Sequence, residues 1–108
     1  MATNNTIVAE SVLNPSGVLD TCSHITTTKK SDLVISKCMP YISTYTFQFW
    51  IRSKSSQSVV FTCDSTIRKI KTTSSWQYFT VTFDVSKISN IVLTLPKSEY
   101  WIYNTKLE

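Results

Sequence analysis

The second half of this chain, from Tyr45 to Glu108, alternates apolar and polar residues almost without interruption. A period of two residues places successive side chains on opposite faces of a β-strand. No window of the sequence shows the period of 3.6 residues that is typical of a helix. This half therefore predicts a succession of short strands, at 45–53, 58–64, 76–85, 90–95 and 100–108.

In the first four segments most apolar residues fall on one side, and the other side carries mainly polar residues, threonine above all. Such alternation is typical of sheets that have one face on a core. The last segment has apolar residues on both sides. The predicted core residues are Tyr45, Phe47, Phe49, Ile51, Val59, Phe61, Cys63, Phe79, Val81, Phe83, Val85, Ile91, Leu93 and Leu95.

The first third of the chain carries weaker strand signals, followed or separated by turn residues. Further strands are expected at 6–13, 18–25 and 33–36. The run Asn-Pro-Ser-Gly at 14–17 predicts a turn, and the segment 53–58, which has no apolar residue, predicts a hairpin loop. Ile67 and Ile70 are out of phase for one strand and predict a bulge or an edge strand. Together the segments predict an all-β sandwich or barrel of eight or nine short antiparallel strands.

A chain of 108 residues is long enough for one domain with its own hydrophobic core. We expect a single β-sandwich domain at 6–108, preceded by a flexible polar arm at 1–5. The arm has no basic start followed by an apolar run, so we expect no secretory signal. No stretch reaches the ~20 apolar residues that a membrane-spanning helix needs, so we expect no membrane partner.

The three cysteines, Cys22, Cys38 and Cys63, are an odd number at wide spacing. The pattern predicts three reduced thiols in a protein made in a cytoplasm, with one disulfide and one free thiol as the alternative. His24, the single histidine, lies two residues from Cys22, but no third group is in place to orient such a pair for catalysis. A zinc site would need closely spaced ligand pairs. We therefore expect no enzyme activity and no metal at these residues.

The net charge of +4 is spread along the chain, which is typical of a solvated surface. Arg68, Lys69 and Lys71 are the densest basic group, but an alternating strand would point Arg68 and Lys69 to opposite faces. An anion-binding adaptor that uses these residues is one functional hypothesis. Nucleic acid is not an expected partner, because a basic stripe with interleaved aromatic residues is missing. With Gly17 as its only glycine, the chain has no phosphate-cradling loop.

Three segments of the second half carry a family resemblance: 45–52 reads YTFQFWIR, 76–83 reads WQYFTVTF and 101–108 reads WIYNTKLE. Their order and aromatic placement resemble the galactose-binding-like jelly roll of carbohydrate-binding modules. This β-sandwich is found beside glycoside hydrolases and in phage tail, baseplate and decoration proteins. The resemblance implies a jelly-roll sandwich, and it implies that Trp76 packs against the core.

Many members of this family hold a structural calcium with an acidic residue in the closing strand. This chain has Tyr103 and Asn104 at the matching positions. Calcium needs several oxygen ligands with carboxylates among them, and the seven acidic residues form no local cluster in the sequence. We therefore expect neither a metal nor another cofactor.

The sides of the predicted strands that face away from the core carry aromatic, amide and guanidinium groups together. Sugar recognition requires such a combination, because a ring covers the apolar C–H face and polar groups pair with hydroxyls. The same residue types anchor protein interfaces, so ligand binding and protein contact remain two alternatives. The candidate residues are Gln48, Trp50, Arg52, Tyr78, Thr80, Trp101 and Tyr103.

Two further functional hypotheses follow. The chain begins at a methionine, has no export signal and ends on its last predicted strand, which favours a non-enzymatic structural or accessory protein of a phage or phage-tail-like particle. It would dock on other virion proteins, form a homo-oligomer, contact host cell-surface glycans and reside in a virion assembled in the host cytoplasm. The alternative is a free-standing or excised carbohydrate-binding module that recognises polysaccharide.

Overall fold

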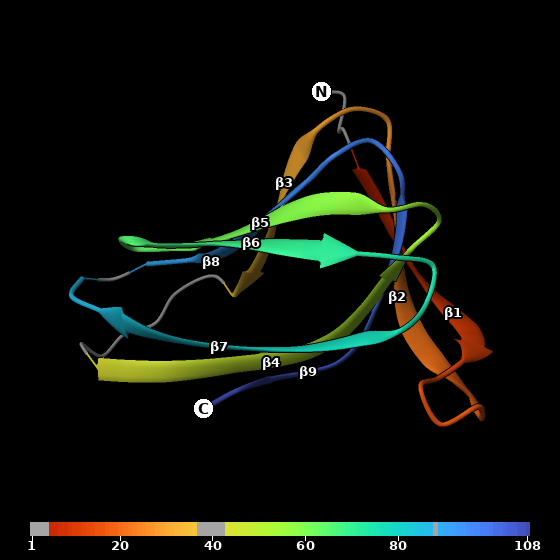
Figure 1. Ribbon diagram of the computed structural model, residues 1–108, viewed down its shortest axis with the longest axis horizontal. Coiled ribbons are helices and arrows are strands. Elements are labelled where there is room, and N and C mark those ends of the chain that lie inside the picture. The colour runs from red at the N-terminus through yellow and green to blue at the C-terminus, as the bar shows by residue number, and fades with distance from the viewer. Residues whose placement is uncertain (1–4, 37–42, 88) are drawn as a thin grey trace.

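The computed structural model describes residues 5–36, 43–87 and 89–108, and every regular element in these ranges is a β-strand (Figure 1). The all-β class and the predicted eight or nine strands are confirmed. The described ranges contain no helix that is long and apolar enough to cross a membrane. The strands are β1 (Asn5–Leu13), β2 (Leu19–Thr27), β3 (Ser31–Ser36), β4 (Ser43–Ser53), β5 (Gln57–Cys63), β6 (Thr66–Thr72), β7 (Gln77–Val85), β8 (Ile91–Leu95) and β9 (Glu99–Leu107).

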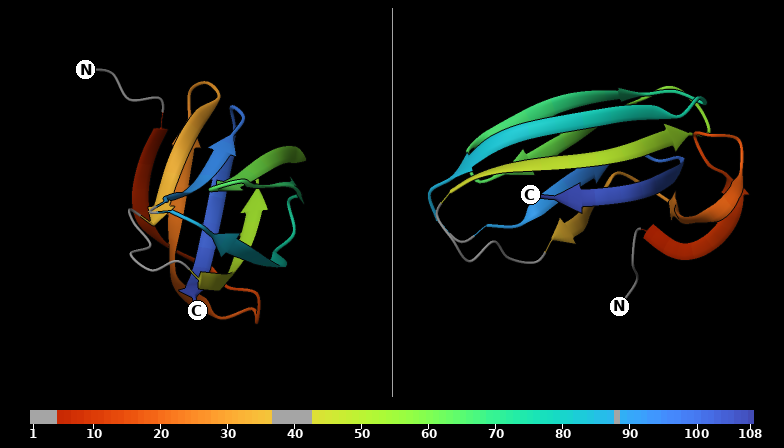
Figure 2. Two further views of the ribbon diagram at one scale, coloured as in Figure 1. Left: turned by 90° about the vertical axis from the view of Figure 1, so that its left-hand side faces the viewer. Right: turned by 90° about the horizontal axis from the view of Figure 1, so that it is seen from below.

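Nine antiparallel strands form two sheets that pack face to face (Figures 1 and 2). The five-stranded sheet has the order β1-β2-β9-β4-β7, and the four-stranded sheet has the order β3-β8-β5-β6. Sequence neighbours therefore often lie in different sheets, as in a jelly roll. The predicted sandwich is confirmed. β1 already begins at Asn5, and the other residues of the predicted N-terminal arm lie outside the described residues.

The core lies between the two sheets and is rich in aromatic rings. The Phe47 ring centroid lies 5.1 Å from that of Phe49 and 6.3 Å from that of Phe61, across the two layers. Twelve of the fourteen predicted core residues are buried, whereas Tyr45 and Phe79 are half-buried and pack against the core margin. The core also contains five residues from strands whose inward side the sequence did not predict: Ile25, Leu33, Ile70, Tyr100 and Ile102.

The segment 53–58 was predicted as a hairpin loop, and this prediction is wrong. β4 and β5 lie in different sheets, so the segment between them connects the two layers. Ser53 is fully buried, and its hydroxyl contacts the Thr72 hydroxyl at 2.7 Å and donates to the Ser55 carbonyl at 2.6 Å. Hydrogen bonds to its neighbours thus allow a polar residue to enter the interior at the crossover.

The turn between β1 and β2 follows the prediction. The Asn14 side-chain oxygen accepts hydrogen bonds from the backbone N–H groups of Ser16 and Val18, and Gly17 takes a φ of 80° that favours glycine. β2 extends beyond its predicted end at Ile25, because the buried Thr27 donates from its hydroxyl to the Pro96 carbonyl and accepts from the Ser98 N–H.

β6 is an edge strand of the four-stranded sheet, which confirms one of the two predicted alternatives. Its pairing with β5 runs without a register shift from end to end. Lys69 pairs with Val60, while Arg68 pairs with the buried Phe61, so these two basic residues lie on opposite faces as predicted. Arg68 therefore shares no patch with Lys69, whereas Lys69 and Lys71 lie on the same outward face.

A bulge occurs instead in β9. Trp50 pairs with Tyr103, whereas Gln48 pairs with Lys106, so β9 has one residue more than β4 over this stretch. Asn104 takes a positive φ of 54° at this place, a conformation that asparagine adopts more readily than most residues. Beyond the bulge, β9 exchanges its inward and outward positions, so Leu107 lies opposite the buried Phe47.

Candidate functional site

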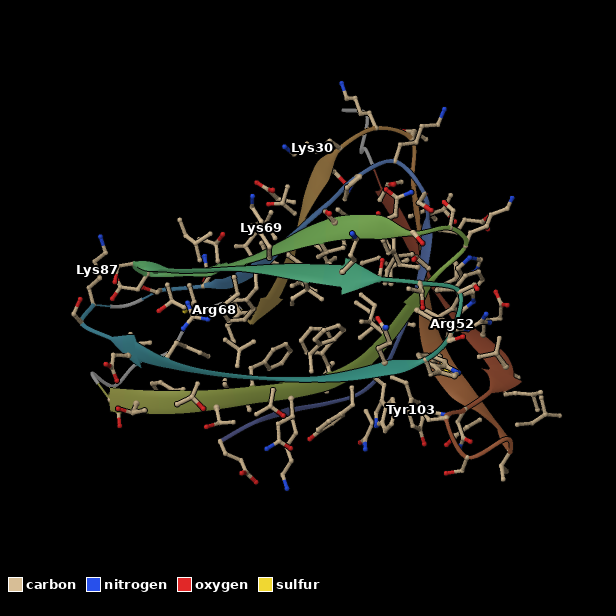
Figure 3. All side chains as sticks on the ribbon, viewed as in Figure 1. Lys30, Arg52, Arg68, Lys69, Lys87 and Tyr103 are labelled. Carbon is tan, nitrogen blue, oxygen red and sulfur yellow. The ribbon has the colours of Figure 1, made fainter. Side chains whose placement is uncertain are left out.

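The outward face of the five-stranded sheet brings all seven candidate residues together. In the register of β4, Trp50 lies opposite Tyr78 of β7 on one side and opposite Tyr103 of β9 on the other. Directly opposed residues of paired strands share a face. The other candidate residues pair as Gln48 with Thr80 and Arg52 with Trp101. Figure 3 shows Arg52 and Tyr103 close to the end of the sheet where the turn between β1 and β2 projects.

One row of planar groups crosses this face, with one group from each of four strands or their ends. The His24 and Trp101 rings are parallel within 5°, with centroids 4.7 Å apart. The Arg52 guanidinium carbon lies 4.1 Å from the Trp101 centroid and 5.4 Å from that of Trp76. Cation–π contacts of this kind hold a guanidinium in a defined plane. We call His24, Trp101, Arg52 and Trp76 the stacked row.

The stacked row covers the ring faces of Trp101. β9 lies between β2 and β4 in the sheet, so His24 and Arg52 cover opposite sides of the Trp101 indole. A saccharide stacks on a free ring face. Trp101 therefore serves to position Arg52, and the ring faces that a ligand could use belong to other residues.

Trp76 is placed differently from the expectation that it packs against the core. It precedes β7, which begins at Gln77, and it is only half-buried. Its indole N–H donates to the Leu13 carbonyl at 2.8 Å, and its ring centroid lies 6.1 Å from that of Tyr103. The polar indole N–H finds a partner at the end of β1, which draws the ring to the outward face. Sequence reasoning missed Trp76 as a surface residue.

A second aromatic pair lies beside the stacked row. The Trp50 and Tyr78 rings are tilted by 49°, with centroids 5.1 Å apart, and Tyr78 is the most exposed ring of this face at 47%. The Tyr78 hydroxyl donates to the Gln48 side-chain oxygen at 2.6 Å. This bond leaves the Gln48 amide N–H groups to face a ligand. The pair combines an open ring with polar donors.

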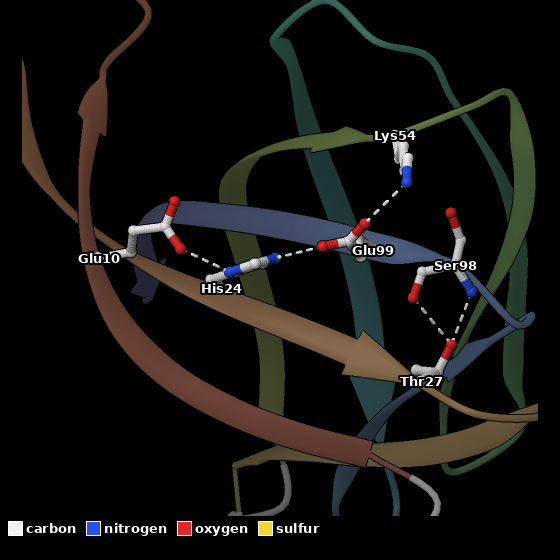
Figure 4. Close-up of polar contacts among 6 residues, drawn as sticks. All are labelled: Glu10, His24, Thr27, Lys54, Ser98 and Glu99. Carbon is white, nitrogen blue, oxygen red and sulfur yellow. Dashed lines mark hydrogen bonds and ion pairs between the residues drawn. The ribbon is translucent and has the colours of Figure 1, made fainter.

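The acidic groups of this face are held by partners (Figure 4). Glu10 lies 2.6 Å from His24 Nδ1 and Glu99 lies 3.2 Å from His24 Nε2, while Lys54 Nζ lies 3.3 Å from the other Glu99 oxygen. Asp20 accepts the Tyr103 hydroxyl at 2.6 Å, and this hydrogen bond is the main reason why the pKa of Asp20 lies below its usual value. Both His24 nitrogens therefore face carboxylate oxygens.

Cys22 and His24 do not form a reactive pair. Both His24 nitrogens face carboxylates, as described above. Burial raises the pKa of the Cys22 thiol, and the nearby charge of Asp20 raises it further, so the thiolate is disfavoured. Cys22 and Cys63 are free thiols, and Cys38 lies outside the described residues. Within the described ranges, no group of three or more potential ligands could hold a metal ion.

A groove of about 570 Å³ opens at one end of the stacked row. Its walls come from the turn between β1 and β2 and from the segment before β7, including Leu13, Ser74 and Ser75. Trp76 of that segment and Arg52 of β4 complete the lining. Two donors of the row, Arg52 Nε and Trp101 Nε1, are buried without a hydrogen-bond partner among the described residues. Such donors are few in native proteins, and stability alone does not explain them.

The comparisons with solved structures agree with this architecture. A family 4 carbohydrate-binding module matches with a TM-score of 0.65 at 15% sequence identity, over 94% of this chain and 77% of that one. A family 11 module from Clostridium thermocellum, in complex with a mixed-linked tetrasaccharide, matches with a TM-score of 0.58 at 11% identity, over 98% and 84% of the two chains. This protein has the fold of a carbohydrate-binding module. The family resemblance predicted from the sequence is confirmed at the level of fold.

The same fold also matches part of a phage protein. The enzymatically active domain of tailspike protein 4 from bacteriophage CBA120 matches with a TM-score of 0.58 at 12% identity. The match covers 97% of this chain and 19% of that chain. No protein-family model matches the sequence, and no curated protein sequence matches it. The likeness is therefore one of fold, and the function must be argued from the site.

Proposed function

We propose that this protein is a non-catalytic carbohydrate-binding module that binds a saccharide on the outward face of its five-stranded sheet. The observation that carries the proposal is the Trp50–Tyr78 pair beside Gln48, an open aromatic surface with amide donors at its edge. A pyranose ring presents C–H groups to an aromatic face and hydroxyls to its surroundings, which this arrangement matches. The family 11 neighbour, whose structure is a complex with a mixed-linked tetrasaccharide, supports the class of ligand.

Affinity gel electrophoresis against soluble neutral and acidic polysaccharides tests this proposal. We expect at least one polysaccharide to retard the wild-type protein, and Trp50→Ala to weaken that binding by about tenfold or more, because the stacking surface is lost. Ile67→Ala is the matched control, since it removes an exposed apolar side chain (63% exposed) on the edge strand β6 of the other sheet. The proposal fails if no polysaccharide retards the wild type, or if both variants bind equally well.

A second candidate function is a structural role in a phage or phage-tail-like particle, supported by the match to the tailspike domain. In this role the chain would reside in a virion, form a homo-oligomer and dock on other virion proteins. Ile7 and Val34, each 50% exposed, line an opening of about 210 Å³ between the sheets and could anchor such contacts. Light scattering over a concentration series distinguishes the two functions. A closed oligomer that binds no polysaccharide would favour the particle role, and a monomer that binds one would favour the module.

A further inference from the structure

Arg52 is held so that only the edge of its guanidinium can meet a ligand. The Trp101 ring covers one face at 4.1 Å, and Trp76 lies at 5.4 Å. β4 lies between β9 and β7 in the sheet, so these two indoles approach from opposite sides. A guanidinium that is fixed in one plane has already lost most of its conformational freedom, which favours recognition of a planar group through two parallel N–H bonds.

Arg52 is also the cation of this face that lacks an acidic partner. Its neighbours His24 and Lys54 are paired with Glu10 and Glu99. Among the described residues, no carboxylate oxygen lies within ion-pair distance of the Arg52 guanidinium. Arg52 therefore has no ion-pair partner among the described residues.

The groove at the end of the stacked row presents this charge to a ligand. Of the described residues that line the groove, Arg52 alone is charged, and the walls otherwise offer serine hydroxyls and the apolar surfaces of Leu13 and Trp76. A neutral groove with one cation attracts an anion, and hydroxyl groups beside it suit a sugar ring.

We propose that Arg52 forms a carboxylate-binding subsite and that the saccharide bound by this protein carries a hexuronate residue in this groove. The inference rests on the proposed function and adds the chemical class of the ligand. The carboxylate accepts two N–H bonds from the guanidinium edge, and the ring that carries it lies between Trp76 and the turn of β1 and β2. A sulfate can also accept two N–H bonds from a guanidinium, so a sulfated probe is needed to distinguish the two anions.

Isothermal titration calorimetry with three matched probes tests the subsite. The probes are an oligogalacturonate, the same oligosaccharide after reduction of its carboxylates to neutral galactose residues, and a sulfated galacto-oligosaccharide of equal length. We expect the wild-type protein to bind the oligogalacturonate about tenfold or more tightly than the reduced probe, since a charged hydrogen bond is lost on reduction. We also expect that the preference falls with added salt.

Arg52→Gln should remove the preference for the acidic probe, and Arg52→Lys should retain only part of it, because an ammonium lacks the planar fork. Lys69→Gln is the matched control, since it removes the same charge from an exposed position on the outward face of the other sheet and should leave the preference intact. If Arg52→Gln fails to fold, the comparison of the three probes on the wild-type protein still tests whether a carboxylate is recognised.

The outcomes separate this inference from the proposed function. Equal binding of the acidic and reduced probes would overturn the carboxylate subsite and leave the carbohydrate-binding function in place. A preference for the sulfated probe would overturn the assignment of a carboxylate. Binding of neither these probes nor any polysaccharide would overturn the proposed function itself, and the subsite with it.

Discussion

The same strands form both faces of the five-stranded sheet, but the inward residues fill the core and the outward residues do not. Phe49 faces the core and is fully buried, whereas Trp50, the next residue, faces outward and is half-buried. The outward face of the four-stranded sheet provides a second comparison. It carries Val60, Lys69 and Thr94, and no aromatic side chain among the described residues. Outward aromatic residues are therefore not a requirement of this sandwich, which supports the proposed binding surface.

The largest effect on stability is expected at Phe49, whose sequence neighbour Trp50 lies on the opposite face. Phe49→Ala should lower the free energy of unfolding by about 3–5 kcal/mol, because it leaves a cavity between the sheets. Trp50→Ala should lower it by about 1 kcal/mol, since the main loss is the contact with Tyr78. Urea denaturation of both variants measures the difference. If Trp50→Ala proves as destabilising as Phe49→Ala, then Trp50 is a structural residue and the contrast between the faces fails.

Two tyrosines of β9, Tyr100 and Tyr103, extend the comparison of the inward and outward faces to alkaline pH. Burial raises the pKa of Tyr100 to about 12 from its usual 10.0, so the folded protein favours the neutral phenol. This contribution to stability is present below pH 10 and is lost as the pH rises from 10 to 12. The loss amounts to about 2–3 kcal/mol by pH 12. Tyr100→Phe should abolish this part of the alkaline loss, although it gives up the hydrogen bond to the Pro96 carbonyl at neutral pH.

Tyr103 is the matched control on the outward face. The pKa of Tyr103 is also raised, but its main cause is the hydrogen bond to Asp20, not burial. Tyr103→Phe should therefore change the alkaline unfolding profile less than Tyr100→Phe does. Chemical denaturation between pH 9 and 12 measures both variants. Ionisation of all the tyrosines together near pH 10, followed by absorbance, would show that Tyr100 is not buried as described.

The smallest effect on stability is expected at the bulge, which determines which residues of β9 face outward. Asn104→Ala should lower the free energy of unfolding by about 1 kcal/mol, because alanine disfavours the positive φ at this position. Asn104→Gly should be close to the wild type, because glycine accepts that φ without steric penalty. Thermal denaturation compares the two variants. Equal stability of the alanine and glycine variants would mean that the bulge does not constrain the chain.

Local patterns predicted much of this molecule. The period of two in the second half identified the inner residues of β4, β5, β7 and β8, and the Asn-Pro-Ser-Gly run identified the turn after β1. These predictions succeed because strand alternation and turn chemistry depend on neighbouring residues. The segment 53–58 was misread, because loop composition does not reveal whether the next strand joins the same sheet or the opposite one.

The candidate site was predicted in its residue types but not in its arrangement. Gln48, Trp50 and Arg52 share one outward face by alternation alone, as do Tyr78 and Thr80. The position of Trp76 on that face was missed, because it depends on a hydrogen bond to Leu13, 63 residues earlier in the chain. The role of His24 was missed for the same reason, since its partners Glu10 and Glu99 lie on two other strands.

The sequence by itself determined that the chain is all-β and which side of each well-patterned strand faces the core, since both follow from alternation over a few residues. The tertiary structure decided which strands are neighbours. Only the order β2-β9-β4-β7 brings His24, Trp101, Arg52 and Trp76 into one row. Strand order follows from how two apolar faces bury each other most completely, and this property belongs to the whole chain rather than to any one segment.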